Sequence, residues 1–388
     1  RSFAVAEIAH SHQNVLWLLL VAYTALALNM LGFLSVELFT VSITSVILFA
    51  CYAASIKYLS GEDAGEDDEE DTNPLTLKQV LVRFAAVAVG IVVLSILISQ
   101  VTDMLAEELN LGKSLAGALF MGVATSLPEL SSTIALFRKK CFDIAVGNIV
   151  GSNIFNTLVI IGASAMAMKI AVSRVTLYRD VSLSFGVAVV LFLMGRDGEL
   201  SRVEGVLLLG VFACFLYNLF AAERKNKKNQ TEAPEQPKDI EPVWKLLLFL
   251  VIGVASLVGG GQLLVNNAAE LARSWGVSES VIGLTILAGG TSLPELATSV
   301  VAARKGSNDL ALGNALGSNI FNITLVLGLC NVISPMHIPL ISTTDWAFLI
   351  GSNVVLAVCA FTRMRLCRLE GFVLLLCYAA YLTLLFSV

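Results

Sequence analysis

Thr125-Ser-Leu-Pro-Glu-Leu130 occurs again as Thr291-Ser-Leu-Pro-Glu-Leu296, and Gly151-Ser-Asn-Ile-Phe-Asn156 occurs again as Gly317-Ser-Asn-Ile-Phe-Asn322. In both cases the second copy follows the first by 166 positions (125 to 291, and 151 to 317). Two identical hexapeptides at one shared spacing indicate an internal duplication, which constrains the fold more strongly than any other feature of the chain. Each copy of the first motif also places a carboxylate, Glu129 or Glu295, inside an apolar stretch.

The composition is that of a polytopic membrane protein. Hydrophobic residues make up 56% and charged residues 14% of the 388 positions, and the mean hydropathy is +0.81. A soluble globule of this size needs far more polar surface. Apolar runs of about 17 to 25 residues recur along the chain, and a helix of that length crosses the hydrocarbon core of a bilayer. Strand-like alternation of polarity is missing, so we expect an all-α fold surrounded by the lipid bilayer.

Polar breaks divide the apolar runs into twelve predicted membrane-spanning helices. They are predicted at residues 14–34, 36–59, 76–105, 113–137, 143–168, 177–194, 203–222, 244–271, 279–303, 309–334, 343–362 and 368–387. The last ten helices form two groups of five, separated by a polar linker. Because five is odd, the second group enters the membrane upside down, which gives two inverted five-helix repeats preceded by two extra N-terminal helices.

These predictions divide the chain into four segments. Residues 1–75 hold a two-helix hairpin and an acidic loop, 76–222 the first repeat, 223–242 the linker and 243–388 the second repeat. The acidic loop lacks the spaced ligands of an EF-hand and is predicted to be a solvated segment. Lysine and arginine number 15 in the loops on the side of the linker and 10 on the other side. The positive-inside rule therefore predicts a cytoplasmic linker.

The two buried carboxylates are the strongest candidates for a functional site. An ionisable side chain in the middle of a bilayer costs about 2.5 to 3.5 kcal/mol even on the insertion scale, so Glu129 and Glu295 require a compensating cation or proton. A proline precedes each glutamate and has no N–H group, so the carbonyl four residues earlier loses its helical donor. Irregular backbone at this depth persists only where it is buried in protein or lines a cavity.

Further oxygen donors surround the glutamates. Thr125 and Ser126 lie four and three residues before Glu129, which places them on the same face of a regular helix. The second repeat reproduces this spacing, and each neighbouring helix adds one serine and one asparagine. These further donors are Thr291, Ser292, Ser152, Asn156, Ser318 and Asn322. A set of oxygen ligands without clustered histidine or cysteine favours hard cations such as Ca²⁺, Na⁺ and Mg²⁺.

The doubled motifs resemble the two alpha repeats of the cation/Ca²⁺ exchanger superfamily, and in particular its prokaryotic sodium/calcium exchangers. The resemblance covers roughly residues 76–388 and implies a ten-helix core with alternating access. It also implies a secondary antiporter in a prokaryotic inner membrane that exchanges Ca²⁺ for Na⁺ and needs neither a cofactor nor an obligatory protein partner.

The resemblance also implies a set of ion ligands. A central Ca²⁺ site would use Glu129 and Glu295 with the backbone carbonyls of Thr125 and Thr291. Two flanking sodium sites would consist of Ala288, Thr291, Ser292, Glu295 and Ser152, and of Gly122, Thr125, Ser126, Glu129 and Ser318. Asn156 and Asn322 would lie beside the two glutamates. Asn322 stands where some members carry aspartate, which removes one formal charge and disfavours potassium co-transport.

Several alternatives remain open at the level of the sequence. The same fold could run on protons, with Glu129 or Glu295 titrating to release Ca²⁺. A passive cation channel would need a continuous polar path, which a sealed inverted repeat disfavours. An enzyme is not expected, because no nucleophile or metal-binding histidine accompanies the glutamates, and no basic patch indicates nucleic acid. Asn148, Asn153, Asn314 and Asn319 are interpreted as structural residues that bond neighbouring helices.

Overall fold

A computed structural model of the chain describes residues 98–109 with gaps at 99 and 103, and residues 113–138, 140–229, 242–253, 281–337 and 341–387. It also describes residues 37–38, 41–42, 255 and 259. The chain divides into two compact units, Arg1–Leu94 and Ser95–Val388. The described residues of the first unit form one antiparallel pair, β1 (Glu37–Leu38) with β2 (Val41–Ser42). All other elements below belong to the second unit.

The β1·β2 pair corrects the start of the predicted helix 36–59. We expected a helix from residue 36, whereas the chain is extended at residues 37–38 and 41–42. The stretch Thr40-Val-Ser-Ile-Thr44 is rich in β-branched residues, which favour extended backbone. The rest of this helix, the predicted helix 14–34 and the acidic loop lie outside the described residues.

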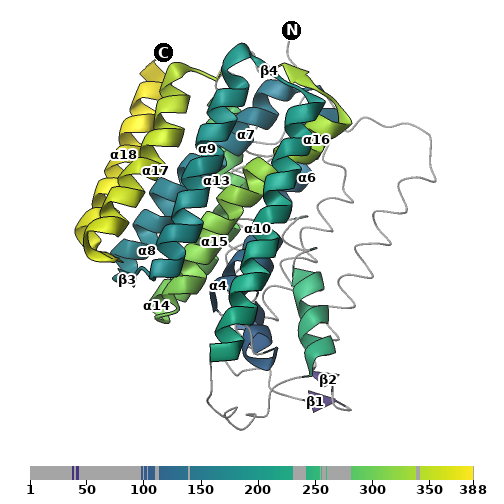
Figure 1. Ribbon diagram of the computed structural model, residues 1–388, viewed down its shortest axis with the longest axis vertical. Helices are drawn as coiled ribbons and strands as arrows, with labels where there is room; N and C mark the ends of the chain where they lie inside the picture. The colour runs from purple at the N-terminus through teal and green to yellow at the C-terminus, as the bar shows by residue number, and fades with distance from the viewer. Residues whose placement is uncertain are drawn as a thin grey trace, which may run out of the picture. The chain divides into compact units, whose positions relative to one another are not determined.

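Each repeat contains a bent span with the first motif, a long span with the second motif, and two further helices (Figure 1). The first repeat contains α4 (Lys113–Ala116), η2 (Gly117–Met121), α5 (Gly122–Thr125), α6 (Leu127–Arg138), α7 (Phe142–Phe155), η3 (Asn156–Ile160), α8 (Ile161–Ala167), β3 (Ile170–Ala171), η4 (Thr176–Val181), α9 (Ser182–Met194), η5 (Gly195–Asp197), β4 (Glu199–Leu200) and α10 (Arg202–Asn229). The second contains η6 (Ile282–Leu287), α13 (Ala288–Thr291), α14 (Leu293–Arg304), α15 (Asn308–Phe321), η7 (Asn322–Leu327), α16 (Gly328–Ile333), β5 (Met336–His337), α17 (Thr343–Arg363), β6 (Arg365–Leu366) and α18 (Arg368–Ser387).

Eight of the predicted spans lie in the described part of the chain. Six helices are long and apolar enough to cross a membrane, and two bent helix pairs bring the number to eight. Their ends agree with the predicted ends within a few residues, except that α10 continues to Asn229 instead of ending at 222. Most of the predicted spans 76–105 and 244–271 lies outside the described residues. The protein is therefore an integral, multi-pass membrane protein.

The helices that carry the two motifs have the same boundaries in both repeats. α5, α6 and α7 coincide with α13, α14 and α15 when 166 is added to their residue numbers, and α10 and α18 begin at the equivalent Arg202 and Arg368. The π-helical turns also correspond, since η3 begins at Asn156 and η7 at Asn322. The duplication seen in two short motifs thus extends to the local conformation of the described parts of both repeats.

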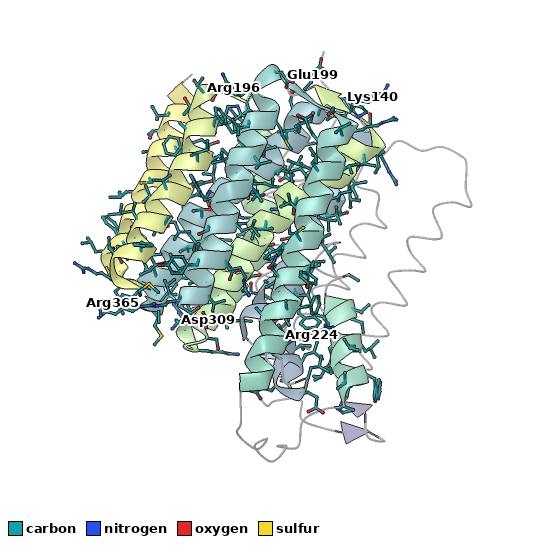
Figure 2. The ribbon with its side chains drawn as sticks, in the orientation of Figure 1. Lys140, Arg196, Glu199, Arg224, Asp309 and Arg365 are labelled. Carbon is teal, nitrogen blue, oxygen red and sulfur yellow. The ribbon has the colours of Figure 1, made fainter. Side chains whose placement is uncertain are left out.

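The short strand pairs show that the repeats are inverted. β3 pairs with β6, and β4 pairs with β5. β3 and β4 follow consecutive antiparallel spans, so they lie at opposite ends of the helices. β5 occupies the same position in the second repeat as β3 in the first (170 to 336), yet β5 lies at the β4 end of the helices. Equivalent strands of the two repeats therefore lie at opposite ends, as an inverted repeat requires. Figure 2 shows Lys140, Arg196 and Glu199 at this β4·β5 end, and Asp309 and Arg365 at the β3·β6 end.

The motif spans are broken at their central serines. Ser126 and Ser292 have φ, ψ values of −86°, 3° and −89°, 7°, and the flanking helices meet at 42° in the first repeat and 51° in the second. Pro128 and Pro294 follow two residues later, where the missing N–H and the bulk of the ring disfavour a continuous helix. The break places the end of one helix and the start of the next at the same depth.

Glycines bring each motif span against the second-motif helix of the other repeat. A Cβ on Gly283 would lie 2.8 Å from the carbonyl oxygen of Ile144, and one on the equivalent Gly117 would lie 2.8 Å from that of Leu310. A Cβ on Gly151 would overlap the carbonyl of Leu284. Such close backbone contact is typical of helix packing in membranes. The centre of the protein is therefore built from both repeats.

Candidate cation-binding site

The two glutamates lie at the broken centres of the motif spans. Glu129 and Glu295 are fully buried, and each is in the first turn of the helix that follows the break, α6 or α14. Ser292 Oγ donates to Glu129 Oε1 at 2.8 Å, and Ser126 Oγ donates to Glu295 Oε1 at 2.9 Å. Each carboxylate is thus bound by a hydroxyl of the other repeat.

This crossed arrangement corrects an expectation drawn from helical spacing. A regular helix would place Ser126 beside its own Glu129, three residues later. Because the helix breaks at Ser126, that hydroxyl instead bonds to Glu295. The equivalent change occurs at Ser292. The oxygen donors therefore converge, but across the two repeats rather than within each one.

The serines of the second motif contact the backbone of the opposite motif span. Ser152 Oγ donates to the carbonyl of Ala288 at 3.5 Å, and Ser318 Oγ donates to the carbonyl of Gly122 at 3.3 Å. Both carbonyls lie in the helix before the break. Each pair joins one serine to one backbone carbonyl of the five residues that the resemblance assigned to the same flanking sodium site.

Asn148 and Asn314 connect the repeats next to the glutamates. Asn314 Oδ1 accepts from Thr125 Oγ1 at 3.2 Å, and Asn314 Nδ2 donates to the carbonyl of Glu295 at 3.2 Å. Asn148 Oδ1 accepts from Thr291 Oγ1 at 3.4 Å. Their structural role agrees with our interpretation of the sequence, which did not foresee that they join opposite repeats. The sequence feature that could have indicated this link is that Asn148 and Asn314 occupy equivalent positions in the two repeats (148 to 314).

Several polar atoms at this centre have no hydrogen-bond partner among the described residues. They are Oε2 of Glu129 and of Glu295, and both amide atoms of Asn156 and of Asn322. An unpaired polar atom away from water costs about 1 to 3 kcal/mol. Six such atoms at equivalent positions of two repeats indicate that the protein binds a ligand here rather than only packing helices.

The electrostatics favour a cation as that ligand. Neither glutamate forms an ion pair with a lysine or arginine among the described residues. An ionised carboxylate buried without compensation is very unfavourable, and two of them in one pocket repel each other. No group of three histidine, cysteine, aspartate or glutamate side chains suited to a metal occurs in the described part of the chain. The available donors are oxygens, which suit hard cations.

All twelve candidate ligands are buried, and eight of them are joined in direct pairs. The pairs are Ser126 with Glu295, Ser292 with Glu129, Ser152 with Ala288, and Ser318 with Gly122. The hydroxyls of Thr125 and Thr291 bond to the carbonyls of Met121 and Leu287 and to the bridging asparagines. Asn156 and Asn322 are buried without such bonds. Their roles as ion ligands stay predictions.

Comparison with known proteins identifies similar sequences and structures. A family model described as sodium/calcium exchanger protein matches residues 79–221 and 245–387. The inner membrane protein YrbG of Escherichia coli (strain K12) is 35% identical over 274 residues, which cover 67% of this chain and 82% of the relative. The sodium/calcium exchanger MaX1 of Methanosarcina acetivorans is 29% identical over 351 residues, with coverage of 80% and 100%.

A solved structure has the same architecture. The sodium-calcium exchanger NCX_Mj, soaked with Na⁺ and Sr²⁺, superposes with a TM-score of 0.65 at 28% sequence identity. The superposition covers 78% of this chain and 99% of that one. Both matched segments of the family model coincide with the two repeats seen in the structure.

Proposed function

We propose a specific exchange for this chain, which belongs to the sodium/calcium exchanger protein family and is a cation/Ca²⁺ antiporter. In the proposed exchange, one Ca²⁺ crosses the membrane in one direction and several Na⁺ cross in the other, through the site between the repeats. The observation that carries the proposal is the crossed pairing of Ser126 with Glu295 and of Ser292 with Glu129. Because both repeats complete each carboxylate site, Ca²⁺ and Na⁺ compete for the same oxygens.

The two cations would use these oxygens differently. Ca²⁺ takes about six to eight oxygen ligands and is neutralised by two carboxylates, so it would sit between Glu129 and Glu295. Na⁺ carries half the charge and needs one carboxylate with neutral donors. The Ser152–Ala288 and Ser318–Gly122 pairs supply such donors on either side of the centre. When a cation arrives, the serine hydroxyls can turn their O–H groups away from the glutamates and direct a lone pair at the ion.

Alternating access would come from rocking of two peripheral gating helices, which would expose the site to one side of the membrane at a time. The gradient of the coupling ion drives the cycle, and no ATP is required because the sequence has no Walker motif. The chain is proposed to act as a transporter and not as an enzyme, without a cofactor or an obligatory protein partner.

Proton coupling is the second candidate. A proton could replace the cation on Oε2 of Glu129 or Glu295, since these atoms lack a partner among the described residues. The serine and carbonyl pairs beside the glutamates favour sodium, because a proton needs no such flanking donors. The two mechanisms differ in the ion that must be present on the opposite side of the membrane.

The charge of the two ends supports a cytoplasmic linker. In the described part of the chain, 14 lysines and arginines lie at the β3·β6 end, where α10 ends, and 4 lie at the β4·β5 end. The 14 are Lys113, Lys169, Arg174, Arg179, Arg224, Lys225, Lys227, Lys228, Lys245, Arg304, Lys305, Arg363, Arg365 and Arg368, and the 4 are Arg138, Lys140, Arg196 and Arg202. By the positive-inside rule, we propose that the β3·β6 end faces the cytoplasm of a prokaryotic cell.

Uptake of ⁴⁵Ca²⁺ into proteoliposomes tests the coupling ion. Vesicles loaded with Na⁺ are compared with vesicles loaded with choline, each with and without a pH gradient. We expect uptake that depends on internal Na⁺ and is unchanged by the pH gradient alone. Uptake that follows the pH gradient and ignores Na⁺ would show that protons drive the exchange.

Two conservative substitutions test the shared site. Glu129→Gln and Glu295→Gln each remove one charge and keep the size of the side chain, so we expect folded protein without Ca²⁺ transport. Asp143→Asn is a suitable control, because Asp143 is exposed at the β4·β5 end. Robust exchange by either glutamine variant would refute a site that needs both carboxylates.

A further inference from the structure

The β4·β5 and β3·β6 strand pairs are related by the repeat, but two equivalent positions in them carry side chains of opposite charge. Arg363 and Arg365 stand where the first repeat has Asp197 and Glu199 (197 to 363, and 199 to 365). Arg365 pairs with Ala171 in the β3·β6 sheet, just as Glu199 pairs with His337 in the β4·β5 sheet. The backbone has thus kept its repeat symmetry at these positions, while the side chains have changed sign.

Five basic side chains are exposed around the β3·β6 pair, and we call them the basic collar. They are Lys169, Arg174, Arg363, Arg365 and Arg368. Residues 169–174 follow α8 and lead into η4, and residues 363–368 join α17 to α18. The collar therefore draws on the loops of both repeats, which the two strands hold side by side. Figure 2 shows Arg365 at this end of the helices.

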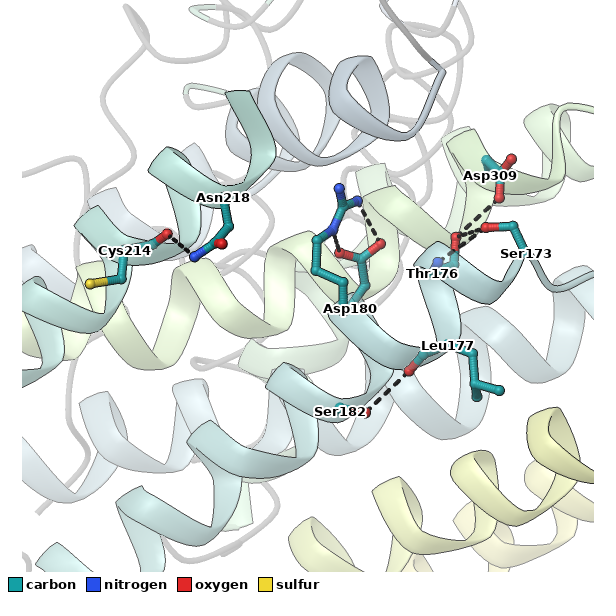
Figure 3. A network of polar contacts seen from close by, with 9 residues as sticks. Ser173, Thr176, Leu177, Asp180, Ser182, Cys214, Asn218 and Asp309 are labelled. Atoms are coloured by element: carbon teal, nitrogen blue, oxygen red, sulfur yellow. Dashed lines mark hydrogen bonds and ion pairs between the residues drawn. The ribbon is translucent and has the colours of Figure 1, made fainter. Parts of the chain in front are cut away.

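The acidic residues close to the collar are already bound to other groups. Asp180 forms an ion pair with Arg179, with Arg179 Nε and Asp180 Oδ1 2.6 Å apart. Asp309 Oδ1 accepts from Thr176 Oγ1 at 3.1 Å, and Figure 3 shows both aspartates with these contacts. Glu370 accepts from the backbone N–H of Cys367 at 2.7 Å. None of these carboxylates forms an ion pair with a side chain of the collar in the described part of the chain.

Exposed apolar side chains lie in the same segments as the collar. The rings of Tyr178 and Phe361 are 62% and 60% exposed, and their centroids are 6.2 Å apart in an edge-to-face contact. Met168 and Val175 are also exposed, at 43% and 48%. Aromatic side chains at the ends of spans typically lie at the level of the lipid headgroups. The collar thus lies where it meets headgroups rather than the bulk solution.

We propose that the basic collar binds the phosphate groups of anionic phospholipids. Arginine matches phosphate oxygens through two parallel hydrogen bonds, and clusters of basic residues beside spans attract anionic leaflets. Because the β3·β6 pair joins a loop of each repeat, a bound headgroup would link the two halves at this end and stabilise one arrangement of them. Anionic lipid would then change the exchange rate as well as bind.

Lipid binding can be measured without transport. The wild type is purified in detergent, mixed with equal amounts of dioleoyl phosphatidylglycerol and dioleoyl phosphatidylcholine, and analysed by native mass spectrometry. We expect phosphatidylglycerol to be retained in preference. R363Q/R365Q should lower this preference about tenfold, whereas the matched control R196Q/R202Q, which neutralises two exposed arginines at the opposite end, should keep it. Equal retention by R363Q/R365Q would show that these arginines serve membrane orientation only.

Exchange in vesicles tests the functional part of the proposal. Proteoliposomes are made from phosphatidylcholine alone or from equal parts of phosphatidylcholine and phosphatidylglycerol, and initial rates are corrected for the orientation of the protein. The negative surface charge of phosphatidylglycerol raises the local Ca²⁺ concentration for every variant alike. The effect of lipid bound to the basic collar is therefore the additional change in exchange rate that the wild type and R196Q/R202Q show in vesicles with phosphatidylglycerol. We expect R363Q/R365Q to lose that additional response. An unchanged response would overturn the functional role, whichever ion drives the exchange.

Discussion

Replacing Asn314 by alanine should weaken cation binding more than the same change at Asn148. Asn314 makes four contacts: Thr125 Oγ1 at 3.2 Å, Thr298 Oγ1 at 2.9 Å, Ser299 Oγ at 2.8 Å and the carbonyl of Glu295 at 3.2 Å. The carbonyl can only accept, so the bond to it fixes which side of the amide carries Nδ2. Asn314 therefore connects the backbone of one candidate ligand residue with a threonine of the other repeat.

The bridge formed by Asn148 is weaker. Its contacts are Thr133 Oγ1 at 3.1 Å, Ser132 Oγ at 3.3 Å and Thr291 Oγ1 at 3.4 Å. The carbonyl of Glu129 accepts from Ser132 Oγ at 3.1 Å instead of from Asn148. A typical hydrogen bond contributes about 1 kcal/mol net, and Nδ2 of Asn314 has two hydrogens for its three acceptors. Asn314→Ala should therefore cost about 3 kcal/mol of interaction energy, and Asn148→Ala, whose contacts are longer, about 2 kcal/mol. A difference of about 1 kcal/mol in cation binding is roughly a fivefold change in affinity.

The assay is the Ca²⁺ concentration at half-maximal uptake, measured for both variants together with thermal unfolding. We expect Asn314→Ala to raise this concentration about fivefold relative to Asn148→Ala. A double-mutant cycle separates positioning from general instability: Asn314→Ala should couple to Ser299→Ala by about 1 kcal/mol and show no coupling to Thr133→Ala, which contacts only the other bridge. Equal affinities in the two alanine variants, or equal coupling in the two cycles, would refute the proposed asymmetry.

Three further substitutions have definite expected outcomes. Gly151→Ala should abolish exchange because its Cβ would overlap the carbonyl of Leu284 beside Ala288, whereas Gly186→Ala, which meets nothing within 4 Å, should leave the rate unchanged. Lys140→Gly should raise the free energy of unfolding by about 1 kcal/mol. Lys140 has a left-handed φ of 60°, which strains a residue with a side chain, and the equivalent Gly306 has φ 77°. A lower melting temperature would contradict this prediction. Ser126→Ala should reduce the apparent Na⁺ affinity several-fold in uptake assays and lower the free energy of unfolding by about 1 to 3 kcal/mol, because Glu295 Oε1 loses its donor. An unaltered sodium dependence would exclude Ser126 as a ligand.

The sequence predicted the eight described spans and the two helix breaks next to the buried glutamates, for physical reasons that act locally. The length of an apolar run matches the thickness of the bilayer, so its ends indicate the ends of the helix. The helix predicted at 343–362, for example, is observed at Thr343–Arg363. The repeated Pro-Glu pair marked both the helix breaks and the buried carboxylates. Both signals depend only on the residues that neighbour each position in the sequence.

The pairing across the repeats could not be predicted from the sequence. Helical spacing assigns Ser126 to Glu129, and only the break at Ser126, together with the position of the second repeat, brings its hydroxyl to Glu295. The strand pairs have the same origin, because β3 and β6 are almost two hundred residues apart (170 to 366) and each is two residues long. Two-residue strands carry no periodic signal, so their partners depend on the inversion itself.

The crossed pairs also explain why the site would open to one side at a time under the proposed exchange. Ser126 and Ser292 lie on different repeats, and each bonds to the carboxylate of the other. Moving one motif span against the other therefore lengthens both bonds together, so neither half can release its carboxylate alone. A cation that bridges the two glutamates replaces both serine bonds with its own. A filled site then replaces the serine links between the two motif spans while the helices around it move, and this exchange of contacts would couple the passage of one ion to the return of another.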